Sequence, residues 1–94
     1  TRDLVIPPSD PLIHYFGSLL RERFGFGSAY LVFHKENPIA AFKANTRNNK
    51  IELTDFVGDS ELEKEAIRVM KEFAWEHDMP LSGKLFDRIR SRIV

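Results

Sequence analysis

Two groups of cationic side chains are the residues in this sequence most able to bind a ligand. The first lies in the segment 43–50 among three Asn residues, and the second recurs at intervals of four near the C-terminal end, along one flank of an expected helix. The six residues are Lys43, Arg47 and Lys50 in the first group, and Lys84, Arg88 and Arg92 in the second. Because Lys, Arg and Asn donate to phosphate oxygens, the two groups predict a bipartite nucleic-acid-binding surface if they lie side by side.

Both groups also have simpler explanations. A polar segment between two strands needs cations and Asn to remain solvated. Cations near the C-terminus of a helix are favoured by the helix dipole. The sequence alone leaves the two interpretations open.

The residues suited to catalysis do not form a recognisable site. His34, at a strand end, could act as a base, but no carboxylate can be assigned to orient it. Glu52 and Asp55 are three positions apart on a strand, so they point to opposite faces and cannot act as a carboxylate pair unless the strand bulges. The chain has no cysteine, and its three His residues are far apart. We therefore expect no catalytic residues, no metal, no cofactor and no small-molecule substrate.

The charge is balanced overall but unevenly distributed. Fourteen basic residues match fourteen acidic ones, which argues against a generally basic nucleic-acid-binding protein. Residues 59–78 contain seven acids against three cations, whereas residues 80–94 contain four cations against one acid. This asymmetry directs any search for an anion-binding surface to the C-terminal segment.

Length and composition predict one soluble globular domain spanning residues 1–94. Apolar residues make up 43% and charged residues 30% of the chain. No apolar run approaches the roughly 20 residues that span a bilayer, and no basic-then-apolar leader opens the sequence. We therefore expect a cytoplasmic protein without membrane contacts. Pro7-Pro8 predicts an extended lead-in over residues 1–9.

The elements that must position these side chains are three strands and three helices. Residues 30–34, 39–44 and 51–57 predict strands, the first two joined as an antiparallel hairpin and the third at an edge. Apolar residues recur at helical spacing between Asp10-Pro11 and Gly25, over residues 61–77 and over residues 83–93, which predicts three helices. The order α-β-β-β-α-α predicts an α+β fold in which the helices pack mainly on one face of a three-stranded antiparallel sheet.

That arrangement would leave the other sheet face open. Leu31 and Phe33 point to one side of the first strand, and Trp75 lies off the apolar stripe of its helix, either packed against the last segment or exposed for a partner. An uncovered apolar face is an interface, so these three residues predict a protein-binding surface or a symmetric dimer.

Residues 30–94 also resemble a known family. The pattern is a hairpin ending in Ala41-Phe42, a strand over residues 50–53, a helix containing Ala66-Ile67, then the run 80–83 with Phe86 three residues on. It is similar to the large polyvalent protein-associated accessory domain of conjugative relaxases and plasmid primases. The resemblance implies a DNA-processing context, in a mobile element or in conjugation, without catalytic residues in this domain.

The functional expectation is therefore a non-catalytic accessory module that contacts DNA or RNA through a basic loop and a basic C-terminal helix. The alternative is a protein-interaction or homodimerisation domain that uses an apolar sheet face.

Overall fold

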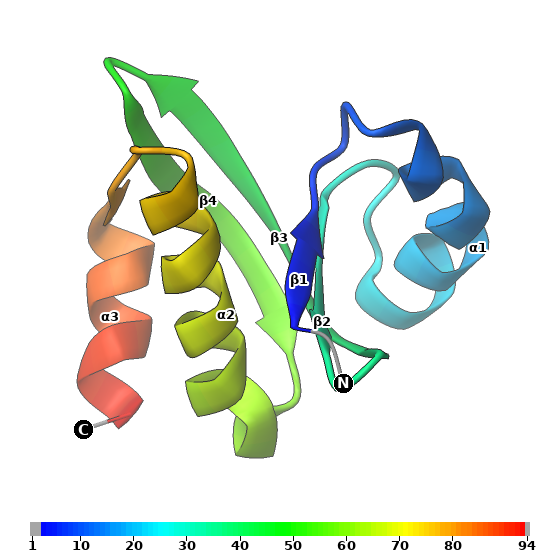
Figure 1. Cartoon of the computed structure of the whole chain (residues 1–94). Helices are drawn as coiled ribbons and strands as arrows, with labels where there is room; N and C mark the ends of the chain where they lie inside the picture. The colour runs from blue at the N-terminus through cyan, green and yellow to red at the C-terminus, as the bar shows by residue number, and fades with distance from the viewer. Residues whose placement is uncertain (1–2, 94) are drawn as a thin grey trace.

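The computed structural model describes residues 3–93, which form a five-stranded sheet and three helical segments (Figure 1). In chain order the elements are β1 (Leu4–Ile6), an N-terminal helical segment (residues 11–24) that includes α1 (Gly17–Leu19), β2 (Tyr30–His34), β3 (Asn37–Arg47), β4 (Lys50–Gly58), a 3-10 turn (Ser60–Leu62), α2 (Glu63–Glu76), β5 (Leu81–Ser82) and α3 (Lys84–Ile93). The predicted α+β class and the three helices are confirmed. The radius of gyration, 12.2 Å, fits a single domain of this length.

The N-terminal helical segment begins and ends as the sequence predicts, but its winding changes along its length. The Asp10 carboxylate accepts a hydrogen bond from the Leu12 amide at 2.9 Å, and Pro11 occupies the first position. The backbone is 3-10 over Pro11–Phe16, α-helical over Gly17–Leu19 and π-helical over Leu20–Phe24. Gly25 ends the segment with a left-handed φ of 77°.

Two tight turns connect the three central strands. Lys35 and Glu36 have φ values of 52° and 68°, and Asn48 and Asn49 have φ values of 54° and 59°. Positive φ at both central residues is the geometry of a type I′ turn, whose twist matches that of the strands. The predicted basic loop over residues 43–50 is therefore wrong: all but Asn48 and Asn49 belong to β3 and β4.

The sheet has the strand order β1-β2-β3-β4-β5, not the three strands predicted. β1 lies in the expected extended lead-in, but it pairs with β2 in antiparallel register, Val5 opposite Val32. β5 pairs in parallel with the start of β4, Ile51 opposite Leu81. β4 is consequently not an edge strand, and α2 is the crossover that joins the two parallel strands.

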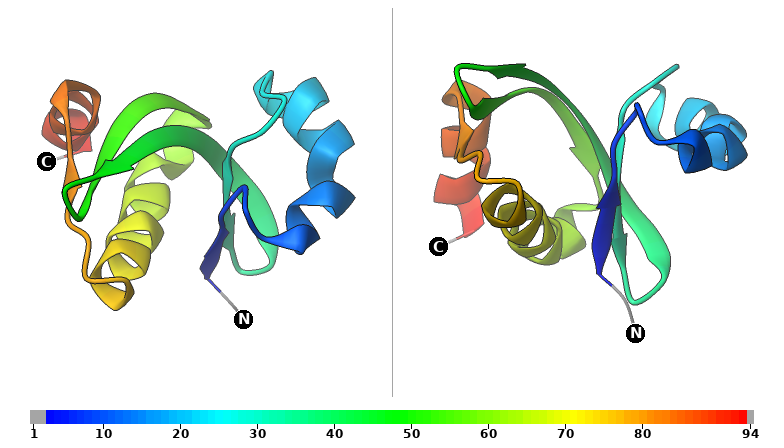
Figure 2. Two further views of the ribbon diagram at one scale, coloured as in Figure 1. Left: turned by 90° about the horizontal axis from the view of Figure 1, so that it is seen from above. Right: turned by 45° about the horizontal axis from the view of Figure 1, so that its top comes forward.

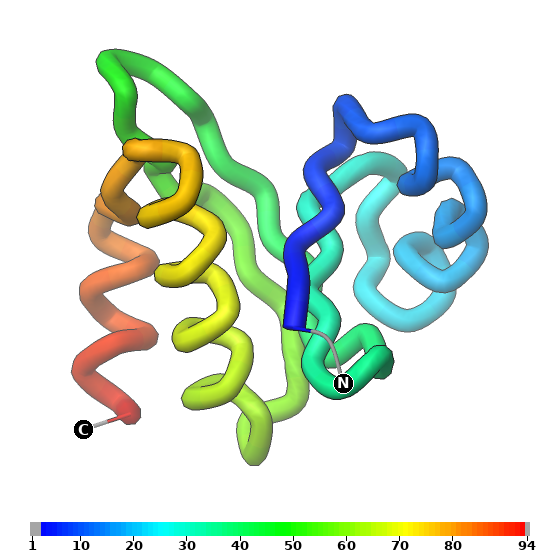
Figure 3. The backbone as a smooth tube through the Cα atoms, in the orientation of Figure 1, coloured from blue at the N-terminus to red at the C-terminus, as the bar shows by residue number. Residues whose placement is uncertain are grey.

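The sheet curls into a half-barrel around α2 (Figures 2 and 3). The β2–β3 register shifts between Val32 and Phe33, and the β3–β4 register shifts between Lys43 and Ala44. An extra residue on one strand increases its local twist and bends it, so these irregularities allow the long β3–β4 hairpin to curve.

Apolar side chains fill both sides of this sheet. On the concave side α2 and α3 bury a large core centred on Phe42, which is fully buried and stacks on Tyr30 with ring centroids 4.7 Å apart. On the other side the N-terminal helical segment buries a second cluster that contains Leu20, Phe24 and Leu31. The expectation of helices mainly on one face is therefore corrected: α2 and α3 lie on one face and the N-terminal segment on the other (Figure 1).

No helix within residues 3–93 combines the length and the apolar character that a bilayer span requires.

Gly58 gives a test of the curled hairpin. A Cβ at this position would lie 2.9 Å from Ala40 Cβ and 3.1 Å from the Ile39 carbonyl oxygen, so Gly58→Ala forces β3 and β4 apart. We expect the free energy of unfolding to fall by about 1–3 kcal/mol in urea denaturation followed by circular dichroism. The control is Gly27→Ala, whose Cβ has no neighbour within 4 Å and should change stability by less than about 1 kcal/mol. Equal stability of the two variants would contradict the close β3–β4 packing.

Candidate functional site

The first predicted cationic group lies on the outer face of the β3–β4 hairpin. Lys43, Asn45 and Arg47 alternate along β3, so they share one face. Their register partners on β4 are Asp55, Glu52 and Lys50, in that order. Three cations therefore share this face with two carboxylates. The expectation that Glu52 and Asp55 point to opposite faces is wrong, because the register shift beside Lys43 leaves one extra residue, Thr54, between them. The Lys43 ammonium also lies 5.5 Å from the centroid of the Phe26 ring. The three cations thus lie on one face of the hairpin, but their positive charge is partly compensated.

The second predicted group lies on the flank of α3. All three residues are exposed, and Arg92 donates to the Glu63 carboxylate at 3.0 Å. Ser82 lies opposite Glu52 in the sheet, so α3 begins beside the hairpin that carries the first group. The two groups thus occupy adjoining elements, with the Glu52 carboxylate near the junction. Lys84 and Arg88 are the members of this group whose charge is not matched by an ion pair within residues 3–93.

The three predicted interface residues differ in their burial in the structure. Leu31 is fully buried and Phe33 is 8% exposed, both beneath the N-terminal helical segment, so the open apolar sheet face predicted from the sequence is absent at these two residues. Trp75, in contrast, is 83% exposed on α2. Of the two interpretations that the sequence left open for Trp75, the structure supports exposure.

A groove lies beside Trp75, between the end of α2 and α3. Its volume is about 440 Å³, within the range of ligand-binding pockets. Apolar atoms form most of its floor. The lining residues are Lys71, Ala74, Trp75, Asp78, Met79, Pro80, Leu81, Phe86 and Arg90. A concave apolar floor, an exposed indole and a few charged groups at the rim are the features of a docking site for an apolar side chain.

Local structure explains why this groove exists. α2 ends at Glu76, and Asp78 takes a left-handed φ of 55°, which turns the chain sharply toward β5. The Met79 amide donates to the Ala74 carbonyl and the Ile51 amide to the Pro80 carbonyl, which fixes the connection against both α2 and β4. The floor is therefore held by hydrogen bonds on both sides.

A second concavity, on the β1 side of α2, has the opposite character. Its volume is about 390 Å³, and its charged lining residues are Asp3, Asp10, Glu72 and Glu76, beside His77. Carboxylates in this number repel phosphate, so this side of the molecule is unsuited to a nucleic-acid backbone.

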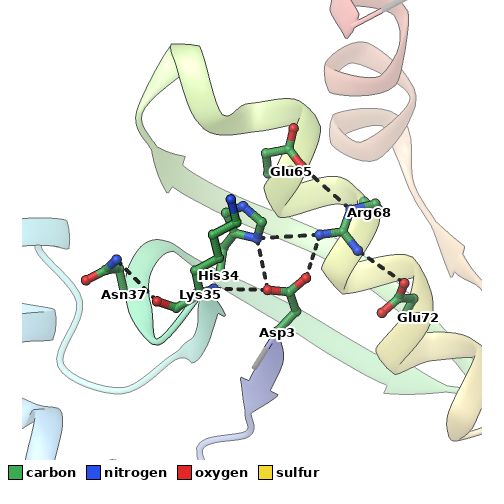
Figure 4. Close-up of polar contacts among 7 residues, drawn as sticks. All are labelled: Asp3, His34, Lys35, Asn37, Glu65, Arg68 and Glu72. Carbon is green, nitrogen blue, oxygen red and sulfur yellow. Dashed lines mark hydrogen bonds and ion pairs between the residues drawn. The ribbon is translucent and has the colours of Figure 1, made fainter. Parts of the chain in front are cut away.

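Asp3 is the centre of the most connected polar cluster (Figure 4). Its Oδ1 atom lies 2.9 Å from His34 Nδ1 and accepts the Lys35 amide at 3.0 Å, while Oδ2 accepts from Arg68 Nη2. Arg68 also reaches Glu72 at 3.2 Å and Glu65 at 3.6 Å. The cluster thus ties the start of β1 to the β2–β3 turn and to α2. No carboxylate partner for His34 could be assigned from the sequence; in the structure the partner is Asp3, 31 positions away.

This cluster determines the ionisation of Asp3. Hydrogen bonds from the Arg68 guanidinium and the Lys35 amide, with His34 adding to them, lower the pKa of Asp3 from 3.8 to about 2. The same carboxylate raises the pKa of Arg68. With its oxygens already engaged by three groups, the Asp3 carboxylate holds the fold together at this point. Within residues 3–93, His, Asp and Glu side chains form no cluster able to hold a metal ion.

In comparisons with known proteins, no family model, no curated protein and no solved structure matches this chain. The resemblance of residues 30–94 to the accessory domain of relaxases and primases therefore remains an interpretation of apolar spacing.

The Asp3 cluster predicts how stability depends on acid. The pKa of Asp3 is lower in the folded state, so the folded state binds fewer protons and its stabilisation is present above about pH 4 and lost as the pH falls toward 2. Asp3→Asn should melt at a lower temperature than the wild type at pH 7, and this difference should shrink as the pH falls from 4 to 2, where about half of the folded-state carboxylate is protonated. Arg68→Gln removes the main cause of the shift and should also weaken the pH dependence. Melting temperatures measured from pH 7 to 2 check both, and a constant difference between wild type and Asp3→Asn would contradict this role.

Proposed function

We propose that this domain is a non-catalytic binding module that holds a peptide segment of a protein partner in the groove beside Trp75. The observation that carries the proposal is the 83% exposure of the indole next to a concave apolar surface. Trp buries about 150–250 Å² when it is packed, so an exposed Trp forgoes a large stabilisation that a partner can supply. Trp and Arg are also the residues most enriched among those that dominate binding energy, and Arg90 lines the same groove.

The non-catalytic part of the proposal rests on the Asp3 cluster. The Asp3 carboxylate lies 2.9 Å from the His34 imidazole, but Arg68 and the Lys35 amide also bind the carboxylate. Hydrogen bonds that favour the ionised carboxylate suit a structural tie better than proton transfer near neutral pH.

The proposed context is that of an accessory domain beside DNA-processing machinery, as the resemblance of residues 30–94 implies. In that setting the groove joins the domain to another protein of the assembly, or to a further segment of the same one.

The peptide-binding proposal is tested with a phage-displayed library of random 12-residue peptides. We expect the wild-type domain to enrich specific peptides and Trp75→Ala to lose at least about tenfold of their binding, because the indole forms one wall of the groove. The control is Tyr15→Ala, since Tyr15 is equally exposed, at 83%, but does not line the groove. Both variants should melt within a few degrees of the wild type, because exposed side chains contribute little to stability. Peptides that bind all three proteins equally would refute the proposal.

Nucleic-acid binding is the second candidate, and strand register favours it. The register places Lys43, Arg47 and Lys50 on one outer face, at the end of a hairpin beside the start of α3. A two-stranded ribbon fits the major groove of DNA, and cations along it meet phosphates. Glu52 and Asp55 on the same face weaken this attraction.

The test is a filter-binding titration with a 20-bp duplex and a 20-nucleotide single strand at increasing salt. Nucleic-acid binding predicts that affinity falls steeply with salt, and that Arg47→Glu with Lys50→Glu removes it. Arg21→Glu with Lys64→Glu, which reverses two exposed cations away from the hairpin, is the matched control and should retain binding. An affinity that does not change with salt concentration, or that the Arg47→Glu, Lys50→Glu variant retains, would rule out this surface.

A further inference from the structure

We infer that the segment held in the Trp75 groove is acidic: a large apolar side chain enters the groove, and carboxylates beside it meet Lys71 and Arg90. This inference rests on the proposed function and specifies the partner's chemistry. It is carried by the charges at the rim, where two cations and one carboxylate surround the apolar floor.

The rim is polarised along α2. Lys71 and Trp75 are one turn apart on α2, so they share one face of the helix. Asp78 lines the same groove from the turn that follows the end of α2 at Glu76. Lys71 precedes the indole and Asp78 follows it, which gives the groove a positive end and a negative end. A bound segment whose apolar side chain packs on the floor and whose carboxylates face Lys71 makes both kinds of contact.

The two cations are available to a ligand. Lys71 forms no ion pair within residues 3–93. Arg90 lies 3.4 Å from Asp87, but both side chains are more than half exposed, and such pairs contribute little. Its guanidinium carbon is also 5.5 Å from the centroid of the Phe86 ring, so it stands over the groove floor. A ligand carboxylate bound here replaces the weak surface ion pair between Arg90 and Asp87 with an ion pair that is partly shielded from water.

The size of the groove limits the occupant. About 440 Å³ accommodates one or two large side chains. The floor contains the uncharged, apolar side chains of Met79, Leu81 and Phe86. The part of the bound segment that enters the groove is therefore an apolar side chain, which is the anchor, and the acidic residues beside it set the direction of the segment.

A basic segment fits poorly. It would meet Lys71 and Arg90 at close range with Asp78 as the single opposing carboxylate in the lining. Like charges set against each other across an interface are unfavourable.

The experiment uses the library peptides whose binding depends on Trp75. We expect these peptides to carry an excess of Asp and Glu over the unselected library. One of them, synthesised without Trp, is then titrated into the domain while the fluorescence of Trp75, the single tryptophan of the chain, reports occupancy of the groove. Replacing its acids with Gln and Asn should weaken binding on the order of tenfold, and replacing them with Lys should weaken it further.

Charge reversal in the protein completes the test. Lys71→Glu with Arg90→Glu should abolish the preference for acidic peptides, whereas Lys64→Glu with Arg88→Glu changes the charge equally outside the groove lining and should preserve it. Neutral or basic peptides that bind as tightly as acidic ones would overturn the inference while leaving the groove's function intact. A selection that yields no Trp75-dependent peptide would overturn both.

Discussion

The burial of the apolar stripe of α2 against the concave face of the curled sheet is the interaction on which the rest of the structure depends. Met70, Phe42 and Leu53 are all nearly or fully buried in this core. The hairpin must curve to surround the helix, and its register shifts and the missing side chain of Gly58 allow that curvature. A flat sheet of the same length would leave part of this stripe in water.

This packing also determines which surfaces remain for binding. α2 directs Ala66, Met70 and Ala74 inward, and α3 covers its side with Phe86 and Ile89. Trp75 lies one position beyond the buried stripe and therefore faces outward beside the joint between the two helices. The cations of the two predicted groups do not line the groove, whereas Arg90 of α3 does. The six residues of those groups are Lys43, Arg47, Lys50, Lys84, Arg88 and Arg92. The Trp75 groove and the candidate nucleic-acid surface therefore share no residue.

The sequence predicted what depends on local periodicity and missed what depends on distant pairing. The helical stripe of residues 61–77 and the alternation of residues 51–57 identify α2 and β4, because each pattern is long enough to be distinctive. β1 and β5 have three and two residues, too few for a pattern, and each exists because a remote strand offers hydrogen-bond partners. Asn48 and Asn49 signal a tight turn in hindsight, since Asn tolerates positive φ better than other non-glycine residues.

The sequence identified several residues of the candidate site, but it did not show how they lie relative to one another. Trp75 was identified as a residue off the apolar stripe, yet its groove forms only when residues 78–81 fold back between α2 and β4. Leu31 and Phe33 were assigned to an open face because the sequence does not reveal that the N-terminal helical segment crosses the sheet. The Asp3–His34 contact joins residues 31 positions apart, which no spacing rule connects.

The environment of Trp75 tests the account most directly, because no other tryptophan contributes to the fluorescence of the chain. Emission spectra and acrylamide quenching of the folded domain should be compared with those of free N-acetyl-tryptophanamide. The account predicts an emission maximum and a quenching constant close to those of the free compound. A blue-shifted emission protected from acrylamide, in a monomeric domain, would show the indole packed inside and would contradict the exposed groove.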